Sequence, residues 1–224
     1  MMRFLTSLFP LLALITATAG EPMRTSFTIR EDLGVSIALL TPAKDSSILR
    51  HTYEDGIDTV VASIADDRDG GLMVEIRDHA NKSLWKHDYG YNLSAQPGCK
   101  IAVAIHPSLP ILLIHYHGYK WDHEHTLLFL DSRPGPLQVR PYATQDQDVL
   151  PALKASKNYS ADFNYLIQAQ SLTKDGVIFE CIPIEKPEVQ SVHPFHQDHS
   201  RWFRVTTAIN ARFQITPTEV RSLE

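Results

Sequence analysis

Apolar and polar residues alternate with a period of two along most of this chain, and clusters of turn-forming residues separate the alternating runs. This pattern, with its many β-branched and aromatic residues, is typical of strands that bury one face. It predicts strands over the ranges 26–30, 35–40, 59–64, 72–77, 83–87, 100–105, 111–117, 125–130, 137–140, 164–171, 177–184, 202–208 and 212–215. The chain is therefore expected to belong to the all-β class.

One segment departs from this pattern. Between Gln145 and Lys157, the apolar residues Val149, Leu150 and Leu153 cluster at helical spacing, although a proline at position 151 disfavours a long helix. We expect a short helix here and little helix elsewhere.

Two polar segments are typical of tight connections between neighbouring antiparallel strands. The segment from Thr173 to Gly176 contains Asp-Gly, a dipeptide that favours hairpins because both residues tolerate positive φ. The segment from Asp66 to Gly71 is expected to join its flanking strands in the same way.

Hairpin-like units recur at irregular spacing. Residues 101–140 supply four successive short strands, and strand-turn-strand patterns begin near residues 72, 127, 177 and 212. This favours antiparallel meander hairpins in a propeller-like fold with three or four irregular blade-like units, and a β-sandwich is the alternative because it produces similar hairpins. We expect residues 20–224 to form one all-β domain.

The first nineteen residues predict a cleavable signal peptide. Arg3 precedes an apolar run over residues 4–15 that is too short to cross a bilayer, and Ala17 and Ala19 are the small residues expected before a cleavage point. We expect cleavage near Gly20 or Glu21, and a secreted or periplasmic mature protein.

Charge argues against two classes of partner. The chain has 21 Lys and Arg against 26 Asp and Glu, and since Arg3 is the only charged residue of the leader, the mature net charge is 20 − 26 = −6. Nucleic acid and anionic lipid both require clustered basic residues, so neither is expected as a partner. The apolar run over residues 101–114 is interrupted by His106, Pro107 and Pro110, so no membrane span is expected in the mature chain.

Two cysteines, Cys99 and Cys181, remain in a compartment where disulfides persist. A bridge would close a loop of 82 residues and stabilise the fold by about 4.5 kcal/mol, less any strain. The alternative is two buried, unpaired thiols. The position of Cys181 inside the apolar run 177–184 favours the unpaired form.

Seven of the 11 histidines lie in two short segments. If residues 118–122 form a five-residue loop, His115 lies opposite His125 and His117 opposite His123, with neighbouring Cβ atoms roughly 5 Å apart on one face. Such a cluster suits Zn²⁺ or Cu²⁺. A four-residue loop would instead place His123 and His125 on the opposite face. The interpretation that the sequence favours is that these histidines form a polar, aromatic rim on a hairpin whose base is buried.

The second segment, with His193, His196 and His199, is expected to be a solvated loop; the alternative is that it supplies a further ligand to the first cluster. Aromatic residues concentrate near the first cluster, and Tyr116, Tyr119 and Trp121 are our candidates for a binding platform. Such rings equally often close the end of a β core.

No catalytic motif is recognised: the chain has no G-x-S-x-G, H-E-x-x-H, glycine-rich phosphate loop or C-x-x-C. We therefore interpret the protein as a secreted, non-enzymatic β-rich module that binds a protein or glycan through its aromatic and His-rich loop edge. One alternative is a metal-binding protein or metal-dependent enzyme that uses the four histidines. Another is a scaffold that a partner completes at an open sheet edge. Apart from the Zn or Cu of the first alternative, no cofactor is expected.

Overall fold

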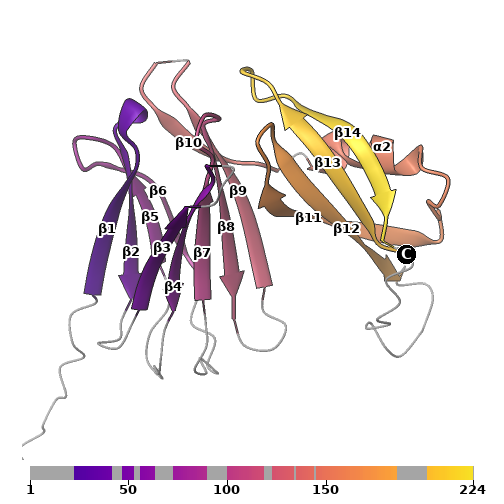
Figure 1. Cartoon of the computed structure of the whole chain (residues 1–224), viewed down its shortest axis with the longest axis horizontal. Helices are drawn as coiled ribbons and strands as arrows, with labels where there is room; N and C mark the ends of the chain where they lie inside the picture. Colours follow the sequence, from indigo (N-terminus) through magenta and orange to yellow (C-terminus); the bar gives the residue numbers. More distant parts are fainter. Residues whose placement is uncertain are drawn as a thin grey trace, which may run out of the picture.

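The computed structural model describes residues 23–41, 47–52, 56–63, 73–89, 100–118, 123–133, 135–143, 145–185 and 201–223. These residues form three antiparallel sheets, so the all-β prediction is confirmed (Figure 1). The predicted signal peptide lies outside the described residues.

Sheet A has four strands and sheet B has six. The order in sheet A is β1-β2-β5-β6, with bounds Met23–Arg30, Val35–Thr41, Met73–Arg77 and Ser83–Asp88, and the short 3₁₀ helix η1 (Glu31–Leu33) lies between β1 and β2. The order in sheet B is β10-β9-β8-β7-β4-β3, with bounds Gln138–Pro141, His123–Asp131, Ile111–His117, Lys100–Ile105, Asp58–Ser63 and Ser47–Thr52.

Sheet C is a four-stranded meander at the C-terminal end of the chain. Its order is β11-β12-β13-β14, with bounds Phe163–Leu172, Val177–Glu185, Phe203–Ile209 and Ile215–Ser222. Helices α1 (Gln145–Asp148) and α2 (Leu150–Lys154) connect sheet B to it. They occupy the segment where the sequence predicts a helix. None of the helices in the described ranges has the length and apolar character needed to cross a membrane.

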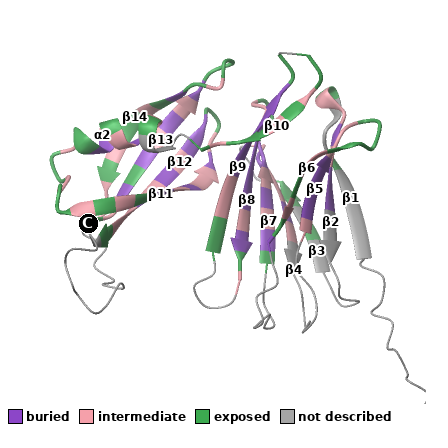
Figure 2. Ribbon diagram, turned by 180° about the vertical axis from the view of Figure 1, so that it is seen from behind, coloured by how far each residue is buried: buried purple, intermediate pink, exposed green. Residues whose placement is uncertain are grey.

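Sheet B lies between two cores because its central strands are apolar on both faces. Alternation in β8 sends Leu112 and Ile114 into the core shared with sheet A, and Ile111 and Leu113 into the core shared with sheet C. All four side chains are buried, and Figure 2 shows the buried bands running along β8 and β9. Burying a side chain of this size contributes roughly 1.5–3 kcal/mol.

Sheet C is inclined to sheet B, and its edge strand β11 lies next to β9 (Figure 1). Its inner face, with Phe179 and Phe203, shares the second core with sheet B and with Leu153 of α2. Propeller blades and sandwich layers both pack face to face in this way. The structure therefore establishes the all-β class and the three sheets.

Two sequence predictions about the strands are wrong. The connection from Asp66 to Gly71 does not join neighbours, because the strand before it, β4, belongs to sheet B and the strand after it, β5, belongs to sheet A. The segment from Arg212 to Ile215 is a turn in which Asn210 Oδ1 accepts hydrogen bonds from the N–H groups of Arg212 and Gln214. Strand β14 begins only at Ile215, the last residue of this segment. Strand β3 is an additional strand that the pattern does not predict.

The predicted hairpin at Thr173 to Gly176 is present between β11 and β12, but its glycine has a different role from the one expected. Gly176 is not among the residues with positive φ. Instead, a Cβ at this position would lie 2.3 Å from the backbone oxygen of Thr207. The glycine is required for close approach to the neighbouring strand.

Candidate functional site

Four imidazoles form a ladder on one face of the β8–β9 hairpin. Strand pairing places His115 opposite His125 and His117 opposite His123, the pairing that a five-residue connection produces. The ring centroids of the inner pair, His115 and His125, are 4.4 Å apart and nearly parallel at 19°. Those of the outer pair, His117 and His123, are 4.9 Å apart and inclined at 70°. We call these four residues the histidine ladder.

The inner pair is partly buried against β11 of sheet C. His125 Nδ1 lies 2.9 Å from the backbone oxygen of Ala169, so Nδ1 carries the proton and donates it to that carbonyl. The Nε2 atom of His115 is buried and has no hydrogen-bond partner. Burial, followed by the nearby His125 and His117, lowers the pKa of His115 to about 4. The His115 ring is therefore neutral near pH 7.

The outer pair is exposed at the open end of the hairpin. The pKa of His117 is lowered, first by desolvation, then by His123, His125 and Lys100. Neutral imidazole is the form that binds metal ions and accepts hydrogen bonds. The outer rings are thus available to solvent and to a ligand.

Two hollows lie between sheet B and sheet C, on either side of the contact between the ladder and β11. One is a cavity of about 330 Å³ lined by Ile57, Thr59, Ala102, Ala104, Leu113, His115, Gln170, Ser171 and Leu172. The other, which we call the β9–β11 groove, has a volume of about 210 Å³ and is lined by His123, Glu124, His125, Leu127, Tyr142, Leu166, Ile167, Gln168, Ala169 and Phe179. Both combine an apolar lining with a few polar groups, as ligand sites do.

The opposite face of the hairpin belongs to the core with sheet A. Tyr116 is 4 % exposed and stacks on Tyr89 with ring centroids 5.2 Å apart. Its predicted place on an exposed binding platform is wrong, because alternation turns it away from the ladder. Burial raises the pKa of Tyr89. Glu124 lies 3.2 Å from Nε2 of His87 in sheet A, so its carboxylate is not directed at the ladder.

The other predicted residues divide between described and undescribed parts of the chain. Tyr119, Trp121, Cys99 and the histidine segment 193–199 lie outside the described residues. Cys181 is buried and has no disulfide partner among the described residues, and its pKa is raised to about 12, mainly by burial. The bridge to Cys99 stays a prediction.

A closed metal site is not preformed. Within the described ranges, no three side chains of the His, Cys, Asp and Glu type are arranged to hold a metal ion. The inner rings stack in parallel, and the inner and outer rings of β8 are 6.2 Å apart. The four-histidine ligand set stays a prediction.

No motif in the sequence identifies His106, which directly follows β7 and is fully buried. Its Nδ1 accepts hydrogen bonds from the N–H groups of Ser108 and Leu109 at 3.1 and 2.8 Å. Its Nε2 therefore carries the proton, 2.9 and 3.0 Å from the backbone oxygens of Thr173 and Lys174. One imidazole thus joins a turn of sheet B to the β11–β12 hairpin of sheet C.

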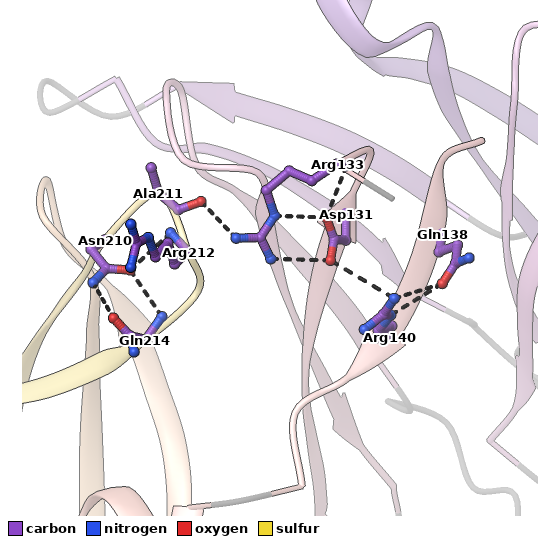
Figure 3. A network of polar contacts seen from close by, with 8 residues as sticks. All are labelled: Asp131, Arg133, Gln138, Arg140, Asn210, Ala211, Arg212 and Gln214. Atoms are coloured by element: carbon purple, nitrogen blue, oxygen red, sulfur yellow. Dashed lines mark hydrogen bonds and ion pairs between the residues drawn. The ribbon is translucent and has the colours of Figure 1, made fainter. Parts of the chain in front are cut away.

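A second polar link joins the same sheets at the C-terminal end of β9, on the same side of sheet B as His106 (Figure 3). Asp131 is buried and accepts hydrogen bonds from the backbone N–H and guanidinium of Arg133. The same guanidinium donates to the backbone oxygen of Ala211 and lies 4.2 Å from the ring centroid of Phe213 in the β13–β14 turn. These hydrogen bonds, chiefly the side-chain bonds from Arg133, hold the pKa of Asp131 below its usual value.

Comparison of the chain with family models, with curated proteins and with solved structures finds no match. The functional argument therefore rests on the ladder, the groove and the cavity.

Proposed function

We propose that this protein is an exported, non-enzymatic binding module whose ligand, a protein or a glycan, is bound in the β9–β11 groove and on the open end of the β8–β9 hairpin. The observation that carries this proposal is the composition of the groove. An apolar lining with Leu127, Leu166 and Phe179 meets the polar groups of His123 and Gln168 in one hollow. Apolar contact supplies affinity in such a site, and a few polar groups fix orientation.

Exposure of apolar surface at the groove supports a binding role. Leu166 is 42 % exposed and lies in β11, three residues before Ala169, whose carbonyl accepts the hydrogen bond from His125. A side chain of this size loses stabilising burial when it remains in water. A ligand that covers Leu166 would recover part of that free energy.

Binding is favoured over hydrolysis by the direction of Glu124. Hydrolysis at the ladder would need a base within hydrogen-bond reach of the reacting atoms. Glu124 lies between His123 and His125 in the sequence. Its carboxylate is paired with His87 on the far side of sheet B. The imidazoles are thus available as hydrogen-bonding and stacking groups.

Export rests on the sequence of residues 1–19. The first described strand begins at Met23, so cleavage near Gly20 or Glu21 would leave every described strand intact. Expression of the full chain in a bacterial host with a periplasm, followed by mass spectrometry of the periplasmic fraction, tests this. We expect the processed mass there, and unprocessed protein retained in the cytoplasm would contradict export.

The ligand proposal is tested with matched arginine substitutions. Leu166→Arg places a charge at the groove, whereas Leu49→Arg changes another exposed leucine, 67 % exposed, on the edge strand β3. We expect the wild type and Leu49→Arg to bind the same glycans on an array, or the same exported proteins of the source organism in solution, and Leu166→Arg to lose that binding at unchanged circular dichroism. Equal binding by both variants, or no binding by the wild type in either screen, would contradict the proposal.

A further inference from the structure

We infer that the exposed outer pair of the histidine ladder, His117 and His123, is an open binding site for a borderline divalent metal ion, with Cu²⁺ bound more tightly than Zn²⁺. The inference goes beyond the proposed function. His123 also lines the β9–β11 groove, but metal binding needs only the two imidazoles and not the apolar lining of the groove.

The first argument is the separation of the two rings. In a tetrahedral site, with metal–nitrogen distances of about 2.0–2.1 Å, the centroids of two imidazole ligands lie about 5 Å apart. The centroids of His117 and His123 are 4.9 Å apart. The strand register fixes this separation, because the two residues are directly paired.

The second argument is the angle between the rings. His117 and His123 are inclined at 70°, so nitrogen atoms of both rings can be directed at one point by rotation about the side-chain bonds of two exposed residues. The inner pair differs, because its rings are stacked at 19° and His125 is held by the carbonyl of Ala169. The outer pair is therefore the one that can chelate.

The third argument is the orientation of the neighbouring ring. His125 donates its Nδ1–H to a backbone carbonyl, the arrangement that orients histidines in metal sites. The centroid of His125 lies 6.4 Å from that of His117. A metal on the outer pair would thus have the ring of His125 on its inner side and solvent on its outer side.

The outer pair supplies two protein ligands, and among the described residues no group of three His, Cys, Asp or Glu side chains is arranged to hold a metal ion. The remaining coordination positions stay open to water. Imidazole suits Cu²⁺ and Zn²⁺, and sites of nitrogen ligands follow the Irving–Williams order, so Cu²⁺ is expected to be the tighter ion.

The test is titration of the purified full chain with Cu²⁺ and with Zn²⁺, followed by isothermal calorimetry and, for Cu²⁺, electron paramagnetic resonance. We expect one ion per chain, tighter binding of Cu²⁺, and nitrogen hyperfine splitting in the spectrum. The double variant His117→Ala/His123→Ala should weaken binding by about tenfold or more, because loss of an outer-shell partner alone weakens metal sites by about 10–100-fold.

Two further variants separate this site from others. His51→Ala/His79→Ala removes two exposed histidines away from the hairpin and should leave binding unchanged. His196→Ala/His199→Ala removes histidines of the second segment and should also leave it unchanged. The inference is overturned if the wild type binds neither ion, if His117→Ala/His123→Ala binds as tightly as the wild type, or if only His196→Ala/His199→Ala loses the metal. Circular dichroism of each variant establishes that the comparison is between folded proteins.

Discussion

Replacement of His106 by phenylalanine tests how strongly one buried side chain joins sheet B to sheet C. Phenylalanine keeps the ring but removes the acceptor for the Ser108 and Leu109 N–H groups and the donor for the Thr173 and Lys174 oxygens. Because His106 is fully buried, water cannot take the place of the imidazole nitrogens without moving the core.

The magnitude follows from the groups left without a partner. Ser108 and Lys174 are exposed, so their backbone groups can turn to water. The partly buried Leu109 N–H loses its imidazole acceptor, and loss of the partner of a buried donor costs about 1–3 kcal/mol. The Thr173 carbonyl loses the imidazole donor but keeps the Gly176 N–H at 3.3 Å, so this change costs one hydrogen bond, about 0.5–1.5 kcal/mol. We therefore expect His106→Phe to lower the free energy of unfolding by about 3 kcal/mol, a large part of the 5–15 kcal/mol typical of a domain.

His106→Asn separates the two halves of this effect. The asparagine Oδ1 reaches the position of Nδ1 and keeps the acceptor, but nothing replaces the Nε2 donor. We expect about half the loss seen with His106→Phe. His79→Phe, at an exposed histidine, is the control and should leave stability within about 0.5 kcal/mol of the wild type.

The assay is urea unfolding followed by far-ultraviolet circular dichroism. The midpoint should fall in the order wild type, His106→Asn, His106→Phe, with an unchanged slope, because the same surface is exposed on unfolding. A His106→Phe variant as stable as the wild type would refute the reasoning. So would a His106→Asn variant as unstable as His106→Phe, since the bonds to sheet C would then carry the whole effect.

Three further predictions concern single residues. Gly176→Ala should destabilise the protein by about 1–3 kcal/mol or more in urea unfolding, because its Cβ would meet the Thr207 backbone oxygen at 2.3 Å; unchanged stability would show that the strand can move away. The lowered pKa of Asp131 means that its stabilising contribution is present above its unfolded value, near 3.8, and is lost as pH falls through the lower folded value. The stability difference between wild type and Asp131→Asn should accordingly be constant above pH 5 and shrink below about pH 4, and a difference that grows with acid would contradict this. Cys181, with its pKa near 12, should resist iodoacetamide at pH 8 in the folded protein; without reductant, labelling in denaturing urea should detect two thiols if Cys99 is unpaired and none if the two are bridged.

Alternation along the chain predicts the strands well where one or both faces are buried. β7 and β8 have the bounds expected from their apolar patterns. β3 escapes prediction because Ile48 and Leu49 are adjacent, which breaks the period of two, and because it is an edge strand paired only with β4. Its outward leucine is 67 % exposed, so burial does not impose a pattern on it.

The sequence pattern does not predict the contacts between sheets. Alternation predicts that the four imidazoles share one face, given the loop length. It does not predict that Ala169, 44 residues away, brings its carbonyl to His125. The groove and the cavity form only when sheet C packs on sheet B, and the order of the sheets is not encoded in the period of any single strand.

The unpartnered nitrogen of His115 links stability to function at the ladder. This side chain lines the cavity with Ile57 and Leu113, and its Nε2 is buried with no hydrogen-bond partner. A buried polar group without a partner costs about 1–3 kcal/mol, whereas an apolar side chain of similar size would gain from burial. A residue that lowers stability in its own environment is typical of a functional site.

His115→Leu should therefore be as stable as the wild type or more stable by up to about 2 kcal/mol, because it removes the unsatisfied nitrogen and adds apolar contact with Leu113. His125→Leu, its stacked neighbour, should lose about 1 kcal/mol, because it removes the hydrogen bond to Ala169. Urea unfolding of both variants at pH 7.5 distinguishes the two directions. If His115→Leu is clearly less stable than the wild type, the imidazole has a stabilising partner in solution, and its burial reflects the fold rather than a ligand.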